Sequence, residues 1–136
     1  MSKILYLHIG MHKTGTSAIQ QYMAENDSKL QRLGCLYPKT GRLGHGHSGL
    51  VNCFDFSVRE RSIASIYPNY KKQDSIYHSS GTPNDIYQCL KQEVVDSNCR
   101  TTILSSECFV EWTDPHEFVD YFDAIFDQIF VVVYLR

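Results

Sequence analysis

The sequence has no long apolar run and no strong excess of either charge. Of its 136 residues, 43% are hydrophobic and 21% are charged, and the formal net charge is −2. No stretch approaches the ~20 apolar residues that a membrane-spanning helix needs. A weakly acidic chain also lacks the basic surface that captures nucleic acid or anionic lipid. We therefore expect no nucleic-acid partner and no membrane partner, so that any anion site must be local.

Cysteine is present, but not in a pattern typical of disulfide frameworks or zinc sites. The five cysteines are odd in number and form no C-x-x-C pair. Disulfide frameworks use even sets of cysteines, and zinc knuckles use closely spaced pairs. Reduced thiols and a cytoplasmic location are the resulting expectation. The first apolar run, Ile4 to Ile9, is broken by His8, which is typical of mature protein rather than of a targeting segment.

Low-complexity tracts and internal repeats are also absent, and the length suits a single domain over residues 1–136. Segments with strand and helix patterns alternate along this domain. Strands are expected at 3–9, Thr101–Ser105 and Ile129–Leu135, and helices from Ser17 to Leu33 (capped by Gly34), from Asn84 or Asp85 to Ser97, and from Pro115 to Phe126. This order predicts an α/β fold of the P-loop NTPase-like type, in which helices cover both faces of a parallel sheet in three layers.

The stretch from Tyr37 to Pro83 has little periodicity, although a short helix is expected around Leu50 to Ile66. An irregular stretch of this length is uncommon in a compact domain and is often a binding loop or lid. An ordinary surface excursion explains it equally well. Its tyrosines, with one in the following helix, could line an acceptor pocket or pack into the core: Tyr67, Tyr70, Tyr77 and Tyr87.

A glycine-rich loop joins the first expected strand to the first expected helix. In Gly10-Met-His-Lys-Thr-Gly-Thr-Ser17 the two glycines stand five residues apart, with a lysine between them and hydroxyls at the helix start. Backbone N–H groups of such a loop converge on an anion at the positive end of the helix, and Lys13 adds a full charge. A Walker A loop has the form G-x-x-x-x-G-K-[ST], but here Thr16 takes the place of its lysine. The loop predicts a site for phosphate or sulfate esters, with the lysine moved three residues upstream.

The residues from His8 to Gln20, His-Ile-Gly-Met-His-Lys-Thr-Gly-Thr-Ser-Ala-Ile-Gln, resemble the 5′-phosphosulfate loop of sulfotransferases. They are most similar to a bacterial family with the pattern H-x-G-x-x-K-T-G-T-[ST]-x-[IL]-Q. The resemblance implies transfer of a sulfuryl group from 3′-phosphoadenylyl sulfate (PAPS) to a hydroxyl or amine of a small-molecule or glycan acceptor, without a metal. It also implies that Lys13 is a catalytic residue, which holds the bridging oxygen of the donor. The implied cofactor-binding residues of the loop are His12, Lys13, Thr14, Gly15, Thr16 and Ser17.

Two later segments agree with this resemblance. Val131-Val-Val-Tyr-Leu-Arg136 is similar to the family's strand that ends in Leu-Arg, which implies that Arg136 contacts the 3′-phosphate of the cofactor. A forked guanidinium suits that contact. Ile103-Leu-Ser-Ser-Glu107 brings a carboxylate to the carboxyl end of a strand, which faces the ligand crevice in a parallel sheet. Glu107 is therefore the first candidate for the general base, and a structural ion pair with an arginine is the alternative.

Histidines compete with Glu107 for the role of base. His12 lies inside the loop, and His45 and His47 lie in Gly44-His-Gly-His-Ser-Gly49, a segment loose enough to reach a crevice. We take His47 as the second catalytic candidate from outside the loop. The same pair of histidines suggests a metal site, but without a third ligand nearby the evidence is weak, and we expect no metal.

Two other functions compete with sulfuryl transfer. A P-loop nucleotide kinase or NTPase would need Mg²⁺ held by an aspartate at a strand end, and the later strands supply only Glu107 as a substitute. A non-catalytic anion-binding module would keep the fold without a complete site. The family pattern continues past Arg136, so we expect the amino-terminal part of a catalytic domain, with an incomplete sheet and little transfer activity alone. An uncovered last strand would favour self-association through its apolar surface.

Overall fold

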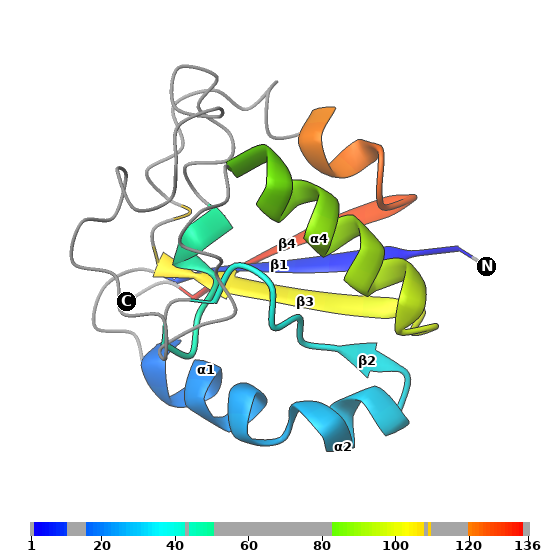
Figure 1. The fold of residues 1–136 in the computed structure, drawn as a ribbon. Coiled ribbons are helices and arrows are strands. Elements are labelled where there is room, and N and C mark those ends of the chain that lie inside the picture. Colours follow the sequence, from blue (N-terminus) through cyan, green and yellow to red (C-terminus); the bar gives the residue numbers. More distant parts are fainter. Residues whose placement is uncertain are drawn as a thin grey trace.

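The strands and helices that the sequence predicts and the structure describes follow one another in the predicted order (Figure 1). The computed structural model describes residues 2–10, 16–42, 44–50, 83–107, 109 and 120–134. Within these ranges the elements are β1 (Ile4–Gly10), α1 (Thr16–Glu25), α2 (Asp27–Arg32), β2 (Cys35–Leu36), α4 (Pro83–Asp96), β3 (Thr101–Ser106) and β4 (Gln128–Tyr134).

The four strands form one sheet in the order β2-β3-β1-β4, and every neighbouring pair is parallel. Parallel neighbours require crossover connections, and helices lie in the connections from β1 to β2 and from β2 to β3. The predicted α/β fold with a parallel sheet is therefore confirmed. The strand β2 was not predicted, because two residues are too few to show the alternation of side chains that marks a strand.

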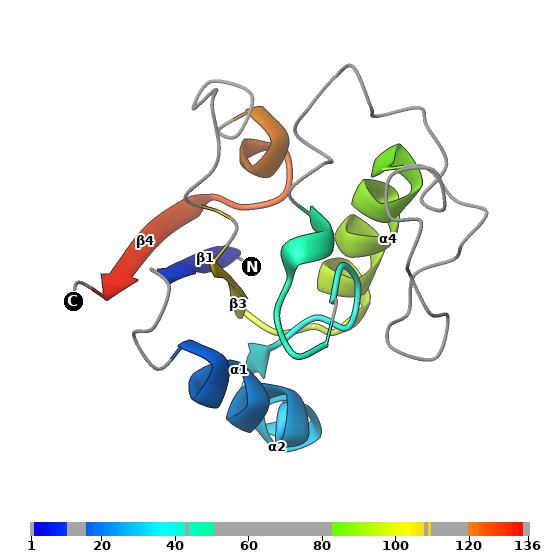
Figure 2. The same ribbon diagram turned by 90° about the vertical axis from the view of Figure 1, so that its left-hand side faces the viewer.

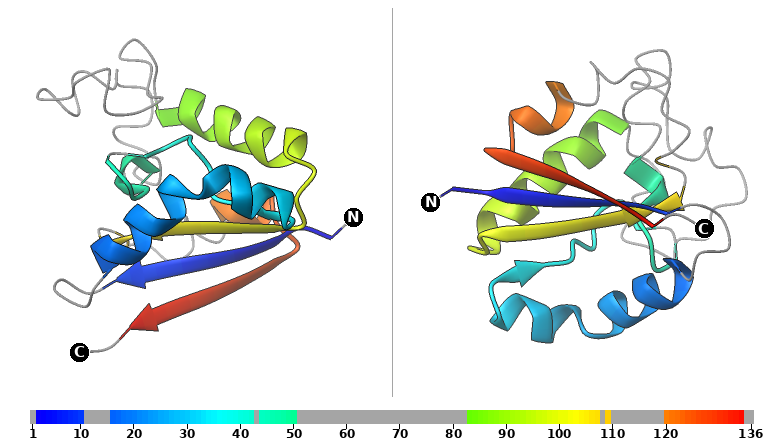
Figure 3. Two further views of the ribbon diagram at one scale, coloured as in Figure 1. Left: turned by 90° about the horizontal axis from the view of Figure 1, so that it is seen from below. Right: turned by 180° about the vertical axis from the view of Figure 1, so that it is seen from behind.

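Helices lie on both faces of the sheet (Figures 2 and 3). Side chains alternate along a strand, so Leu7 points to one face and His8 to the other. The helix α4 covers the Leu7 face, where its residue Leu90 belongs to the same buried cluster as Leu7. The helix α1 lies on the His8 face, where Gln20 reaches Ser105, the residue that is aligned with His8 in β3. The sheet is thus the middle of three layers.

The hydrophobic core lies between the sheet and α4. Three α4 residues with helical spacing, Ile86, Leu90 and Val94, are buried against β1 and β3. Each such side chain contributes roughly 1.5–3 kcal/mol through removal of its apolar surface from water. The rest of the cluster comes from the strands and from other segments: Leu5, Leu7, Leu36, Leu50, Cys99, Leu104, Phe109, Tyr121, Phe122 and Phe126.

The first helix is shorter than predicted. The helical pattern from Ser17 to Leu33 is divided at Asn26, whose backbone and side-chain nitrogens both donate to the carbonyl oxygen of Tyr22. The second piece ends as expected, because Gly34 adopts a φ of +83° and its N–H donates to the carbonyl oxygen of Gln31. Two large apolar residues of this segment, Tyr22 and Leu33, are exposed rather than buried.

The strand β4 pairs with β1 alone in the part of the chain that the structure describes. Its side chains Phe130, Val131 and Val133 are 44–52% exposed, and the ring of Phe130 stacks on that of Tyr6 at 5.3 Å between centroids. The strand thus presents apolar side chains on both of its faces, with no charged residue between Gln128 and Tyr134. Self-association through this edge remains a prediction.

Two predicted segments fall largely outside the described residues. Of the helix expected from Pro115 to Phe126, the structure describes only residues 120–126, and 120–123 are helical. Of the stretch from Tyr37 to Pro83, it describes 37–42, 44–50 and the first residue of α4, so the helix expected around Leu50 to Ile66 is not tested. Among the described cysteines, Cys35, Cys89 and Cys99 form no disulfide in the structure.

Candidate functional site

The carboxyl ends of β1, β3 and β4 meet at one edge of the sheet. The register aligns Ile9 with Ser106 and Gly10 with Tyr134, so the three strands end close together. The half-buried Glu107 directly follows β3. Because β3 is the neighbour of β1, Glu107 lies at the same edge as Gly10, from which the loop leaves. This is the strand-end position that the sequence predicts, and the role of Glu107 as a base stays a prediction.

The helix α1 begins at the hydroxyl residues of the loop. Thr16 is its first residue, and Ser17 follows with an exposed side chain. No acidic residue lies in the first turn of this ten-residue helix, so the helix itself places no carboxylate beside its first N–H groups. Such a helix start favours an anion. The other predicted cofactor residues lie outside the described part of the chain: His12, Lys13, Thr14, Gly15 and Arg136.

His47 is fully buried, and both of its ring nitrogens are hydrogen-bonded. The nitrogen Nδ1 lies 3.1 Å from the backbone nitrogen of Ser105 and accepts its N–H, so the ring proton is on Nε2. Nε2 then donates to the carbonyl oxygen of Pro38 at 2.8 Å. Burial lowers the pKa of His47 to about 3, an effect that the Pro38 carbonyl opposes in part and the Arg42 guanidinium reinforces.

These bonds make His47 a substitute for a strand at the edge of β3. The strand β2 ends at Leu36, opposite Thr102, and does not reach Ser105. There the backbone N–H of His47 donates to the carbonyl oxygen of Ser105 at 2.7 Å, while its ring accepts the N–H of the same residue. In this arrangement the ring has no lone pair for a substrate proton. These bonds give His47 a role in the fold and disfavour a role as a base, which stays an untested prediction.

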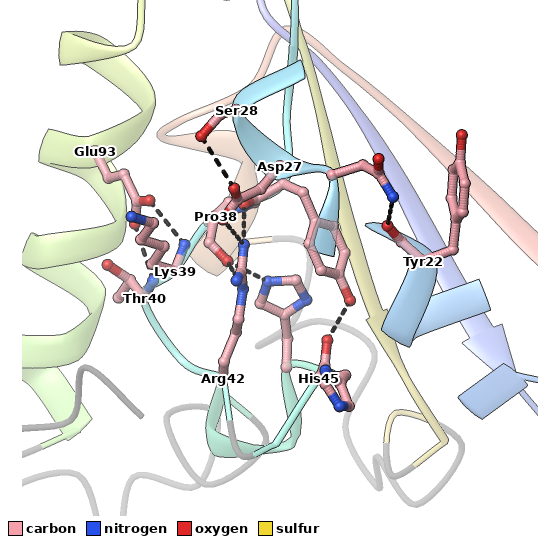
Figure 4. Close-up of polar contacts among 12 residues, drawn as sticks. Tyr22, Asp27, Ser28, Pro38, Lys39, Thr40, Arg42, His45 and Glu93 are labelled. Carbon is pink, nitrogen blue, oxygen red and sulfur yellow. Dashed lines mark hydrogen bonds and ion pairs between the residues drawn. The ribbon is translucent and has the colours of Figure 1, made fainter. Parts of the chain in front are cut away.

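Arg42 holds the turn after β2 in place (Figure 4). Its Nε donates to the carbonyl oxygen of Pro38 at 2.7 Å, and its Nη2 lies 3.1 Å from a carboxylate oxygen of Asp27. The guanidinium also lies 4.8 Å from the centre of the Tyr37 ring. The hydroxyl of Tyr37 donates to the carbonyl oxygen of His45 at 2.6 Å. His45 therefore contributes its backbone to this cluster, and its side chain is exposed.

Glu93 of α4 anchors the same turn from the other side (Figure 4). Its two carboxylate oxygens accept the backbone N–H groups of Lys39 and Thr40 at 2.7 and 2.9 Å. Gly41 follows with a φ of +83°, and a Cβ atom there would lie 2.5 Å from Cγ of the buried Leu50. Residues 37–42 and 44–50 are thus packed against α4 and the core. The interpretation of this stretch as a lid does not hold for these residues.

A second polar cluster lies on the α1 face of the sheet, and the sequence analysis did not identify it. The hydroxyl oxygen of Ser105 lies 2.7 Å from Nδ1 of His8 and accepts a hydrogen bond from Nε2 of Gln20 at 3.1 Å. Both His8 and Ser105 are buried, and burial lowers the pKa of His8. His8 and Gln20 are the first and last residues of the loop motif, and this was the sign in the sequence that the two residues belong to one site. Nothing in the sequence pointed to Ser105 as their common partner.

The opposite face carries a smaller polar contact at the same strand end. The hydroxyl oxygens of Ser48 and Ser106 lie 3.0 Å apart, which ties residues 48–50 to the end of β3. Of the four tyrosines considered for an acceptor pocket, Tyr87 packs its ring against that of Tyr121 at 4.2 Å and against the core. The other three tyrosines lie outside the described residues.

Within the described ranges, no group of three or more His, Cys, Asp or Glu side chains is placed to hold a metal ion. No helix in those ranges is both long enough and apolar enough to cross a membrane. Comparisons of this chain with family models, with curated proteins and with solved structures found no match.

Proposed function

We propose that this chain belongs to a PAPS-dependent sulfotransferase with a P-loop NTPase-like domain. The observation that carries the proposal is the loop from Gly10 to Ser17, which connects β1 to α1 at the carboxyl edge of a parallel sheet. Ligands of parallel α/β sheets bind at this edge, outside the ends of the strands. The lysine position and the flanking residues of the loop match the sulfotransferase pattern more closely than they match a Walker A loop.

The reaction assigned to this site is an in-line displacement at sulfur. The acceptor's oxygen or nitrogen forms a bond to sulfur, and the bond from sulfur to the bridging phosphate oxygen breaks. Lys13 neutralises the negative charge that develops on that bridging oxygen. The loop N–H groups and the start of α1 hold the 5′-phosphate, which aligns the donor with the acceptor. Glu107 receives the acceptor's proton.

The remaining assignments follow from the resemblance. His12 contributes to the cofactor site from within the loop, and Arg136 contacts the 3′-phosphate of the nucleotide. The acceptor is a small molecule or glycan in the cytoplasm, and the site works without a metal. Because Lys13 and Glu107 have different roles, a variant that lacks either side chain should lose sulfuryl transfer even when the acceptor is present.

Replacing Lys13 with alanine is expected to weaken the binding of adenosine 3′,5′-bisphosphate, the desulfated cofactor, by about 10- to 100-fold. A charge-assisted contact to a phosphate has this order of strength. Isothermal titration calorimetry of the purified chain measures the effect. The matched control is Lys29→Ala, which removes the same charge from an exposed position in α2 and should leave the affinity unchanged. Equal affinities in the two variants would remove the loop from the proposal.

Chelation of metals separates this proposal from the kinase alternative. With EDTA present, the affinity for adenosine 3′,5′-bisphosphate is expected to stay within about twofold of its value in Mg²⁺, since the loop contacts need no bridging ion. The comparison ligand is ATP, titrated under both conditions. Strict dependence on Mg²⁺ together with a preference for ATP would support a P-loop kinase or NTPase. Binding of the bisphosphate without transfer to any acceptor would support a non-catalytic anion-binding module.

A further inference from the structure

Ser105 joins three parts of the molecule at the end of β3. Its hydroxyl contacts His8 of β1 and Gln20 of α1, at 2.7 and 3.1 Å. Its backbone N–H and carbonyl oxygen are bonded to His47. The two side-chain partners stand on either side of the loop, because β1 ends two residues after His8 and α1 begins four residues before Gln20. The base proposed above, Glu107, follows Ser105 by two residues.

We propose that the Ser105 hydroxyl is a positioning group, which fixes the end of β1 and the start of α1 relative to the strand end that carries Glu107. This inference rests on the proposed function for its catalytic meaning. The five residues between Gly10 and Thr16 must span the distance between the end of β1 and the start of α1. A hydroxyl that holds both elements therefore fixes the distance between Gly10 and Thr16, the two described residues that flank the loop.

The chemistry of a serine hydroxyl suits this role. It has one donor and two acceptor lone pairs, so it can bond to the His8 ring and the Gln20 amide at the same time. Ser105 is fully buried, so water does not compete for those bonds. A purely structural role would change the stability of the fold when a bond is lost. A positioning role also changes the affinity for the anion under conditions where the variant is fully folded.

A substitution at Gly46 is a second way to disturb the contact between Gln20 and Ser105. A Cβ atom at this position would lie 2.7 Å from Oε1 and 3.0 Å from Nε2 of Gln20. The obstructing atoms are the far end of a flexible side chain, so the amide can move away at little cost to the fold. Gly46→Ala is therefore expected to displace Gln20 from Ser105 without changing either residue.

The experiment compares Gln20→Ala, Gly46→Ala and the double variant by calorimetry with adenosine 3′,5′-bisphosphate at 10 °C. The matched control is Gln21→Ala, which makes the same change in the same helix and removes a bond to the exposed Glu25. We expect each single variant to weaken binding by about 5- to 10-fold, as loss of one aligned hydrogen bond would. The control should stay within twofold. The double variant should resemble Gln20→Ala, because an alanine at 46 has nothing left to displace.

Amide hydrogen exchange in the absence of ligand provides a second readout. Exchange of the α1 amides at residues 20–23 should be about 5- to 10-fold faster in Gln20→Ala and Gly46→Ala than in Gln21→Ala, since the start of the helix has lost its contact with the sheet. Equal exchange and equal affinity in the Gln20 and Gln21 variants would overturn the inference. So would full additivity of Gln20→Ala and Gly46→Ala. A wild-type chain that bound no bisphosphate would refute the proposed function, while the exchange data would still decide whether Ser105 holds the two elements.

Discussion

Lowering the pH from 7 to 4 is expected to reduce the free energy of unfolding by roughly 3 kcal/mol through His47 alone. In the folded chain the pKa of His47 lies at about 3, whereas an unfolded chain restores it to about 6.5. Between these values only the unfolded state takes up a proton at this residue. The contribution of His47 is therefore complete above pH 6.5 and is lost progressively as the pH falls toward 3. Burial also lowers the pKa of His8, which acts in the same direction.

The surroundings of the His47 ring explain why it stays neutral. The ring is fully buried, and the Arg42 guanidinium nearby adds a positive charge that disfavours a second one. The Tyr37 ring packs edge-on at 4.6 Å between centroids, and its own burial raises the pKa of its phenol, so it supplies no negative charge. The Pro38 carbonyl oxygen favours protonation but does not outweigh the burial.

Urea unfolding at pH 7, 5.5 and 4 measures this effect. The informative variant is His47→Asn, because an asparagine oxygen can still accept the Ser105 N–H but does not titrate. This variant should be less stable than the wild type at pH 7 and should lose less stability on acidification. The control is His45→Asn, which removes an exposed histidine from the same segment and should follow the wild-type curve. A wild-type stability that is flat between pH 7 and pH 4 would contradict the prediction.

The parts of the fold that the sequence predicted are those specified by local patterns. The strands β1, β3 and β4 are rich in β-branched, aliphatic and aromatic residues. The helix α4 shows its buried face at regular spacing, and Gly34 marks a helix end through its positive φ. The break at Asn26 was missed because the apolar spacing continues across it. The side-chain bond that divides the helix there is not visible in a pattern of apolar residues.

The missed features of the site depend on contacts between distant residues. Seen in the sequence, His47 is one of two histidines between glycines, a pattern that suggested an accessible base. Its actual partners, Pro38 and Ser105, are brought to it only because β2 ends early and leaves an edge of β3 to be filled. The strand-end position of Glu107 needed only the parallel order of the strands, so it could be predicted.

The removal of the base is expected to have the largest effect on catalysis. In a longer form of the enzyme that is competent for sulfuryl transfer, Glu107→Gln should lower the turnover by ~10²-fold or more, the usual contribution of a general base. A glutamine at 107 keeps the size of the side chain but cannot accept the acceptor's proton. The affinity for adenosine 3′,5′-bisphosphate should change less than about twofold, because the proposed nucleotide contacts come from the loop and from Arg136 rather than from this carboxylate.

The measurement is transfer of labelled sulfate from PAPS to a panel of phenolic, amine and glycan acceptors, beside calorimetry of the nucleotide. Glu107→Asp retains a carboxylate on a shorter side chain and should keep part of the activity. The comparison with Glu107→Gln therefore shows whether the carboxylate or the size of the side chain is required. The control for charge is Glu25→Gln, the same change at an exposed position in α1, and it should leave turnover unaltered. Because both ring nitrogens of His47 are already engaged, no second base is available to replace Glu107 among the described candidates. Turnover in Glu107→Gln equal to that of the wild type would therefore exclude Glu107 and direct the search to His12, inside the loop.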